Sequence, residues 1–366
     1  MRPCEAPLTR VAAAAYEIRT DAPEADGTLE WDRTVLVVVE IEADGQTGLG
    51  YTYADGSIVR LIEGKLRSVI SERSAFDIAG ANVALWRNIR NLGRSGLVAT
   101  AISAVDAALW DLKAKLLGTS VAALLGCCRD SVPIYGSGGF TTYTDNQLRN
   151  QLSGWAERNG CHWVKIKIGS DPARDPERVA VARGAIGDAG LFVDANGAFS
   201  AKEALALAER IAEHDVSWFE EPVSSDDFVG LTLMRERAPA RMDITAGEYG
   251  YNLDDFRRLL EAPSVDVLQA DVTRCGGISG FMQVAALCEA RHIDLSGHCA
   301  PALHLHVACA APRLRHLEWF HDHVRIEHML FDGTPEPHEG EVSPDFSRPG
   351  LGLVFKKRDA EAFRIG

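Results

Sequence analysis

Residues 163–169, WVKIKIG, alternate between apolar and basic side chains. Read as a strand, this stretch places Val164 and Ile166 on one face and puts Lys165 and Lys167 together on the other. By itself the stretch is typical of an edge strand with solvated lysines. The apolar runs that follow it in the chain favour an interior strand instead.

Downstream of this stretch, short apolar runs recur, and each ends in a charged or polar residue. Neighbouring run ends are 20 to 29 residues apart, which is roughly the length of one strand, one helix and two loops. Such a repeat predicts a (β/α) barrel, whose strand ends share the C-terminal rim where active sites lie. After the two lysines, the run ends carry Asp194 and Asn196, Glu220 and Glu221, Glu248, Asp271, His298 and Glu318.

The barrel is expected to begin near residues 132–137, and helical segments are expected between its strands. The loop GSGGFTTY at residues 136–143 would bring Ser137 and Phe140 to the end of the first strand as candidate substrate contacts. In the alternative interpretation, its glycines serve only to make a tight turn. The expected helices lie at about 144–159, 174–189, 200–213, 225–238, 252–262, 276–290 and 301–310.

The first part of the chain reads as an α+β domain. Strands are expected at residues 9–19 and 34–43, the second ending in the turn Asp44-Gly45, and helices at 57–73, 75–92 and up to Gly118. Residues 21–32 are polar and contain Pro and Gly, which predicts a loop long enough to act as a lid, or a disordered hairpin loop. The predicted division is 1–126 for a capping domain, 132–340 for the barrel and 341–366 for a segment that returns to the capping domain.

Composition narrows the function classes. The chain of 366 residues is 46% hydrophobic and carries a net charge of −14, which argues against nucleic acid or an anionic membrane as partner. Its eight cysteines show no metal-binding spacing and are expected to be buried free thiols in a reducing cytosol. No apolar run approaches the length of a membrane span, and no signal-peptide core precedes the first strand, so we expect a soluble, cytoplasmic protein. We also expect it to form a homo-oligomer.

Asp194, Glu220 or Glu221, and Glu248 would end three consecutive strands about 4.8 Å apart. Three carboxylates that close require a cation, and an all-oxygen ligand set suits Mg²⁺ rather than zinc. Pairing of Glu248 with an arginine is an alternative. Alternation alone leaves open which of the two adjacent glutamates faces inward.

The remaining strand-end residues suit proton transfer. Positive charge nearby would favour the neutral amine of Lys165 or Lys167 and so make one of them a base. Asp271 beside His298 would fix the tautomer of the imidazole and raise its basicity. Glu318, if protonated, could donate a hydrogen bond to a developing oxyanion. Together these groups predict proton abstraction next to a carboxylate, through an enediolate.

As a set, these motifs resemble the enolase superfamily, mandelate racemase subgroup, over nearly the whole chain. The resemblance rests on VKIKIG, DAN, EEP, GE, the Asp271/His298 pair, Glu318 and the helix SAVDAALWDLKAKLLG. It implies a modified TIM barrel, (β/α)7β, with an N-terminal α+β capping domain. It also implies that Asp194, Glu220 and Glu248 bind Mg²⁺. The further implied roles are Lys167 as one base, Lys165 as its neighbour that holds the substrate carboxylate, and His298 as the opposite base or acid.

Members of this subgroup share the first step and differ afterwards. A β-hydroxyl that leaves with a proton from His298 would give an acid-sugar dehydratase, and reprotonation would give a racemase or epimerase. The acidic lid, with Trp31 as a further substrate contact, favours a polyhydroxylated monocarboxylate and hence a dehydratase. The other classes considered are a Schiff-base lysine enzyme and a non-catalytic carboxylate-binding or scaffold protein.

Overall fold

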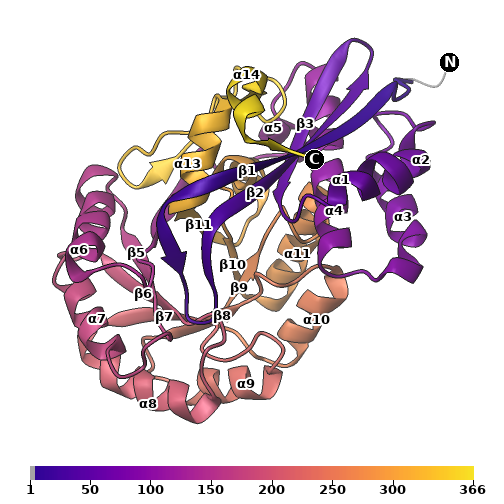
Figure 1. Cartoon of the computed structure of the whole chain (residues 1–366). Coiled ribbons are helices and arrows are strands. Elements are labelled where there is room, and N and C mark those ends of the chain that lie inside the picture. Colours follow the sequence, from indigo (N-terminus) through magenta and orange to yellow (C-terminus); the bar gives the residue numbers. More distant parts are fainter. Residues whose placement is uncertain (1–4) are drawn as a thin grey trace.

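A computed structural model describes residues 5–366. Its centre is a parallel barrel that closes because β11 pairs with both β10 and β4, which confirms the predicted barrel (Figure 1). The strands are β4 (Val132–Gly138), β5 (Trp163–Lys167), β6 (Gly190–Asp194), β7 (Val216–Glu220), β8 (Asp243–Ala246), β9 (Val267–Ala270), β10 (Asp294–Gly297) and β11 (Leu314–Phe320).

The register of the strands brings the candidate site residues side by side. Lys167 is the partner of Asp194 across β5 and β6, and Asp194 is the partner of Glu220 across β6 and β7. Below them the barrel is filled by a separate cluster of Tyr135, Phe192, Trp218 and Val267. The polar groups therefore lie at one rim, on an apolar floor.

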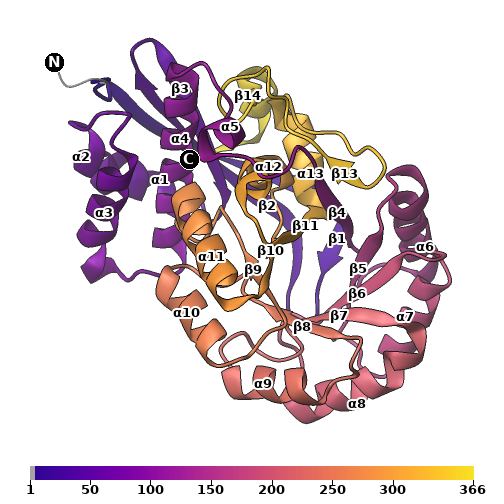
Figure 2. The ribbon, with the colours of Figure 1, turned by 180° about the vertical axis from the view of Figure 1, so that it is seen from behind.

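Helices surround the barrel, as expected from the βα repeat (Figure 2). Three of them begin with a capping box, for example Ser200 with Glu203 at the start of α8. The helices are α6 (Asp145–Ser153) with η3 (Gly154–Arg158), α7 (Asp175–Arg183), α8 (Ala201–Ile211) with η4 (Ala212–His214), α9 (Phe228–Arg237), α10 (Leu253–Glu261), α11 (Gly277–Arg291), α12 (Pro301–Ala310) and α13 (His321–Leu330). Helix α13 was not predicted, because its polar first turn follows β11 without a loop.

The N-terminal α+β part is an antiparallel sheet covered by helices. Gly50 allows α4 to lie close to β3, since a Cβ there would be 2.1 Å from the carbonyl oxygen of Ala104. The elements are β1 (Arg10–Ala25), β2 (Glu30–Ala43), β3 (Gln46–Tyr53), α1 (Ile58–Leu61), η1 (Ile62–Leu66), α2 (Arg67–Ile70), α3 (Ile78–Asn88), η2 (Arg90–Leu92), α4 (Leu97–Leu116) and α5 (Val121–Leu125).

The expectation of a loop at residues 21–32 is wrong. Strands β1 and β2 continue through most of it, with Glu24 opposite Trp31 and a register shift between Arg19 and Glu24. The carboxylate of Asp26 closes the tip by accepting hydrogen bonds from the backbone N–H groups of Thr28 and Leu29. The polar composition therefore belongs to a long hairpin, which crosses the barrel mouth in Figure 1 and which we call the lid hairpin.

The last part of the chain touches both halves of the molecule. Strand β13 (Glu341–Val342) pairs with β4, and β15 (Arg364–Ile365) pairs with β1. The other elements there are β12 (Phe331–Asp332), β14 (Val354–Phe355), α14 (Lys357–Ala360) and η5 (Glu361–Phe363). The domain boundaries at residues 126, 132 and 340 stay a prediction.

Five of the seven cysteines in the described residues are buried and all seven are free, whereas Cys127 and Cys128 are exposed. Cys4 lies outside the described residues. Among residues 5–366, no helix combines the length and the apolar character needed to cross a lipid bilayer.

Candidate active site

Three carboxylates converge at the ends of β6, β7 and β8. One oxygen each of Asp194, Glu220 and Glu248 lies within 4.8 Å of the others, and all three residues are buried. Burial and the charge of Asp194 raise the pKa of Glu220 to about 8. Such clustering is stabilised by a cation, and the oxygen donors are those that Mg²⁺ prefers.

The structure distinguishes the two adjacent glutamates. Glu220 points into the barrel, where its Oε1 lies 2.6 Å from Lys165 Nζ and its Oε2 accepts a hydrogen bond from Trp218 at 2.9 Å. Glu221 has a left-handed backbone conformation, with φ 36°, and its buried Oε1 makes no hydrogen bond. Glu220 is therefore the one that joins Asp194 and Glu248.

Both lysines are buried and paired with these carboxylates. Lys167 Nζ lies 2.5 Å from Asp194 Oδ2 and donates to Asn196 Oδ1 at 3.0 Å. Burial lowers the pKa of Lys167, but the carboxylates of Asp194, Glu248 and Glu220 together outweigh burial and hold that pKa above its ordinary value. The sequence suggested that nearby positive charge would favour the neutral amine. In the structure, attraction to the carboxylates dominates over repulsion between the two lysines.

Asp271 and His298 form the expected pair at the ends of β9 and β10. Nδ1 of His298 is 2.9 Å from Asp271 Oδ2, and its Nε2 is 3.1 Å from Glu248 Oε2. Arg274 adds a cation on this side, 3.5 Å from Asp271 and 3.7 Å from Glu248. The alternative pairing of Glu248 with an arginine is therefore also present, alongside the carboxylate cluster.

Glu318 is held as a carboxylate. Its Oε1 accepts a hydrogen bond from Ser137 Oγ at 2.6 Å and lies 2.8 Å from Lys165 Nζ. Burial raises the pKa of Glu318, but the charges of Lys165, His298 and Lys167, with the hydrogen bond from Lys165, together outweigh burial and hold the pKa well below its usual range. The expectation of a protonated donor is not supported here.

A cavity of about 210 Å³ connects these groups to the lid hairpin. Of the four expected substrate contacts, Asn196 and Trp31 line it, whereas Ser137 and Phe140 do not. Both of the latter are fully buried: Ser137 holds Glu318, and the ring of Phe140 supports that of Trp31 edge-on at 5.8 Å. The glycine-rich loop at residues 136–143 therefore does not bring these two side chains to the cavity.

Four of the five acidic side chains at residues 21–32 contact other groups of the protein, and Glu30 is exposed. Glu24 accepts a hydrogen bond from Trp31 Nε1 at 2.8 Å, Asp21 pairs with His321, and Asp32 pairs with Arg33. Of the lid acids, only Asp26 lines the cavity, and its carboxylate closes the hairpin tip. The lid acidity thus gives no reason to exclude a diacid.

Sequence reasoning missed several residues that line the cavity, including Arg274, His323 and Cys299. Arg274 follows Asp271 by three residues in a turn, in which its N–H donates to the carbonyl of Asp271 at 2.9 Å, so its position could have been inferred from the strand end. Nδ1 of His323 accepts a hydrogen bond from the backbone N–H of Ala300, and its ring stacks on that of Tyr53 with the ring centroids 3.5 Å apart. No local sequence pattern indicates these contacts. Cys299 carries its thiol into the site beside His298.

The same chain matches two family profiles. Residues 14–126 match the profile described as mandelate racemase/muconate lactonizing enzyme, N-terminal domain. Residues 147–360 match the profile described as enolase C-terminal domain-like. The two matches cover both the lid-bearing part and the barrel.

Two curated relatives act on sugar acids or their lactones, by name. The D-galactarolactone cycloisomerase of Agrobacterium fabrum is 33% identical, over 98% of this chain and 99% of that protein. The L-talarate/galactarate dehydratase of Salmonella typhimurium is 32% identical, over 88% of this chain and 81% of that protein.

Solved structures agree with the fold and with the metal chemistry. A mandelate racemase/muconate lactonizing enzyme-like protein from Rubrobacter xylanophilus superposes with a TM-score of 0.96 at 48% identity, over 98% of this chain and 100% of that one. A racemase from Streptomyces coelicolor with bound magnesium gives 0.91 at 30% identity, over 98% and 100% of the two chains.

Proposed function

This chain belongs to the mandelate racemase/muconate lactonizing enzyme family of the enolase superfamily, and on that premise we propose that it is a Mg²⁺-dependent acid-sugar dehydratase. It would remove the α-proton of the sugar acid and expel the β-hydroxyl to give a 2-keto-3-deoxy acid. The observation that carries the proposal is the placement of Lys167 and His298 on strands from different sides of the barrel, with three buried carboxylates between them.

Asp194, Glu220 and Glu248 are the residues that would hold the metal. Their fit rests on the all-oxygen donor set, its burial, and the buried Oε1 of Glu221 beside it, which makes no hydrogen bond. Bound Mg²⁺ would supply positive charge for the substrate carboxylate and, by sharing the charge of Asp194, would lower the pKa of Lys167.

Lys167 is the proposed base, because its ammonium faces the cavity and is slightly exposed, whereas Lys165 is fully buried. Lys165 would hold the substrate carboxylate and keep Glu318 ionised. His298, oriented through Nδ1 by Asp271, presents Nε2 to the cavity and is the proposed acid for the leaving hydroxyl. Asn196 and Trp31 would contact the substrate.

The sugar-acid names of the two curated relatives support the substrate class. Racemisation or epimerisation of a 2-hydroxy acid is the second candidate, since the same base and acid on two faces of the α-carbon can return the proton with inversion. The name of the Streptomyces coelicolor relative is the observation that favours it. The products of the two reactions differ, so one assay separates them.

The test is a screen of mono- and diacid sugars with the purified protein and Mg²⁺, read by 2-keto acid formation and by α-deuterium incorporation in D₂O. We expect keto acid from at least one substrate. EDTA should abolish turnover, added Mg²⁺ should restore it, and the melting temperature should fall when the metal is removed. Full activity without metal would contradict the proposal, and inversion without keto acid would establish the racemase.

Three finer predictions accompany this function. The free cysteines fit a reducing cytoplasm, which cell fractionation can test. A homo-oligomer is predicted and can be measured by light scattering. Limited proteolysis at the junctions near residues 126–132 and 340 would test the domain division.

A further inference from the structure

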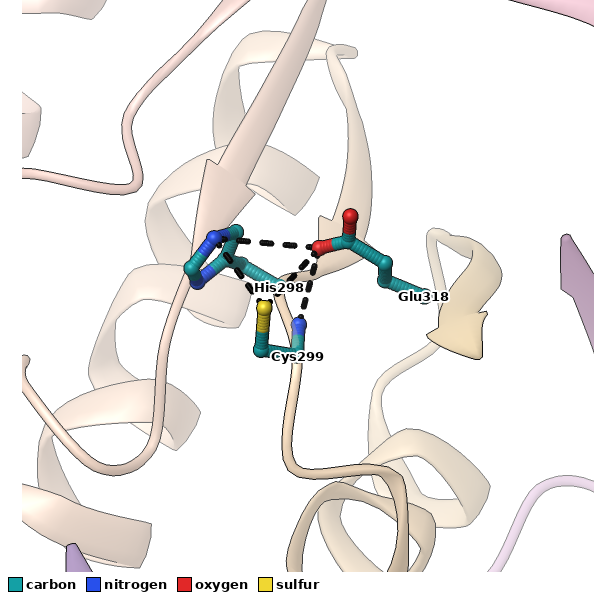
Figure 3. A group of neighbouring side chains, drawn as sticks. All are labelled: His298, Cys299 and Glu318. Carbon is teal, nitrogen blue, oxygen red and sulfur yellow. Dashed lines mark hydrogen bonds and ion pairs between the residues drawn. The ribbon is translucent and has the colours of Figure 1, made fainter. Parts of the chain in front are cut away.

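The side chains of His298, Cys299 and Glu318 point toward one another beside the cavity (Figure 3). Cys299 Sγ lies 3.3 Å from His298 Nε2 and 3.4 Å from Glu318 Oε2, and these two atoms are 3.7 Å apart. All three residues are at least nine-tenths buried, with exposed fractions of 4%, 5% and 1% for Cys299, His298 and Glu318. The proton transfers proposed above use no thiol.

These three distances are close to those of a tetrahedral metal site. Zinc binds sulfur at about 2.3 Å and nitrogen or oxygen at about 2.0–2.1 Å, which places neighbouring donors in a tetrahedron roughly 3.3–3.6 Å apart. We propose that His298 Nε2, Cys299 Sγ and Glu318 Oε2 form a binding site for a thiophilic divalent cation such as Zn²⁺, next to the carboxylate cluster, since Nε2 is also 3.1 Å from Glu248 Oε2.

The backbone is shaped to bring the first two donors together. Consecutive residues of a strand point to opposite faces, so Cys299 would turn away from His298 if β10 continued. Instead Cys299 has φ 53° and Ala300 has φ 38°, both in the left-handed region that non-glycine residues rarely occupy. This conformation places the imidazole and the thiol on the same side.

The groups behind the donors are also those of a metal site. Nδ1 of His298 is 2.9 Å from Asp271, the arrangement that orients metal-binding histidines. Ser137 and Lys165 hold the other oxygen of Glu318, so Oε2 is the one turned to the thiol. The three residues line the 210 Å³ cavity, which leaves the fourth position for water or a substrate oxygen.

The two neighbouring sites differ in chemical softness. Thiolate and imidazole favour Zn²⁺, whereas the carboxylates of Asp194, Glu220 and Glu248 favour Mg²⁺. On binding, the thiol would release its proton to solvent, and the cation would occupy the nitrogen that we assign as the acid. Zn²⁺ should therefore inhibit the Mg²⁺-loaded enzyme. This inhibition rests on the proposed function, but the binding does not.

The test uses Co²⁺ as a spectroscopic substitute for Zn²⁺, titrated into the full-length protein saturated with Mg²⁺. A cysteine ligand gives a near-ultraviolet thiolate-to-cobalt band, which oxygen ligands do not give. We expect the band in the parent, its loss in Cys299→Ser, and its displacement by Zn²⁺. The matched control, Cys127→Ser with Cys128→Ser, removes exposed thiols and should keep the band. Circular dichroism checks the fold of each variant.

A second measurement needs no variant. Stoichiometric Zn²⁺ should slow the alkylation of Cys299 by iodoacetamide at least about tenfold, read by peptide mass spectrometry, and Mg²⁺ should not.

The third measurement changes the residue that orients the histidine ligand. Asp271→Asn should weaken Zn²⁺ binding by about 10–100-fold, as expected for a group that hydrogen-bonds to a metal ligand. A parent without the band, a folded Cys299→Ser that retains it, or unprotected Cys299 would overturn the site. Failure of the substrate screen would leave all three measurements valid.

Discussion

The two sides of the cavity hold their proton-transfer groups in different ways. On the lysine side, Lys165 and Lys167 come from one regular strand; Lys167 pairs with Asp194 of the adjacent strand β6, and Lys165 pairs with Glu220 of β7, two strands away. Strand register alone therefore positions them. The pairing also ties their protonation to the charge of the carboxylate cluster.

On the histidine side, the groups come from strand ends and from a left-handed turn. His298 is oriented by Asp271 from the next strand, and Cys299 and Ala300 bend the backbone away from β10. Loop geometry rather than register decides what enters the site here. The comparison teaches that the lysine side leaves little room for variation, whereas the histidine side can admit an additional donor such as the thiol.

The largest expected effect separates the two sides directly. Lys167→Ala removes the proposed base, so both α-deuterium exchange in D₂O and keto acid formation should fall by about 10²–10⁴-fold. His298→Asn removes only the acid, so exchange should persist while keto acid formation falls by a similar factor. Nuclear magnetic resonance and a keto acid assay measure the two rates. Parental exchange in Lys167→Ala, or normal dehydration by His298→Asn, would show that the roles are wrongly assigned.

A smaller effect is expected when the histidine is kept and its partner is changed. Burial lowers the pKa of His298, but Cys299, Glu248, Glu318 and the hydrogen bond with Asp271 outweigh burial and raise it. Because an acid must be protonated, dehydration is lost as the pH rises through this pKa. Asp271→Asn removes one raising contribution, so the alkaline limb of kcat/KM should move to lower pH.

The matched control is Asp106→Asn. Asp106 is also buried, but its contacts are Asn82 and the N–H of Ser279, outside the cavity. It should change stability and leave the alkaline limb in place. An unmoved limb in Asp271→Asn would mean that Asp271 does not act through the imidazole.

The same contrast explains what sequence could predict. Groups fixed by alternation and register, such as Lys165, Lys167, Asp194 and Glu248, were expected at the rim and lie there. The barrel and most of its helices were predicted for the same reason. These features depend on periodicity, which a sequence displays directly.

Features that depend on local backbone conformation or on distant contacts were missed. Alternation places Cys299 opposite His298, and only its positive φ reverses this. The ionised state of Glu318 depends on Lys165 from another strand. The polar segment at residues 21–32 forms strands because each arm pairs with the other, which composition alone does not reveal.

The lid hairpin touches both sides and offers a test of each. At the lysine side, a Cβ on Gly27 would lie 2.3 Å from the oxygen of Ala195 and 2.6 Å from that of Ile168. Gly27→Ala should therefore displace the tip and raise KM for all substrates. Trp31→Ala keeps the tip in place but removes an aromatic cavity wall, so it should change the preference between substrates by about tenfold.

Gly64→Ala is the control for the first variant, because a Cβ on Gly64 would have no atom within 4 Å and the residue is in a helix. It should leave KM unchanged. If Gly27→Ala, Trp31→Ala and Gly64→Ala all kept the KM values of the parent for every substrate, the lid hairpin would not contribute to substrate binding.

The smallest expected effect concerns the pH response of the lid hairpin at Glu24. Glu24 is fully buried beneath Trp31, and burial, followed by the charge of Asp322, raises its pKa from 4.5 to about 8. A raised carboxyl pKa means that the folded state binds the proton more tightly than the unfolded state. This contribution to stability is complete below pH 4.5 and is lost as the pH rises toward 8.

Glu24→Gln keeps a side chain of the same shape that can still accept the hydrogen bond of Trp31 Nε1, but it cannot ionise. Its melting temperature should match that of the parent near pH 5 and exceed it increasingly up to about pH 8, by roughly 2–4 °C for each 1 kcal/mol of ionisation cost avoided. Glu30→Gln, at an exposed position of the same hairpin, should show no such trend. A constant difference between Glu24→Gln and the parent at every pH would mean that ionisation of Glu24 does not strain the lid. A difference that grows with pH, accompanied by a parent KM that rises over the same range, would place the pH sensitivity of substrate capture at Glu24 of the lid hairpin.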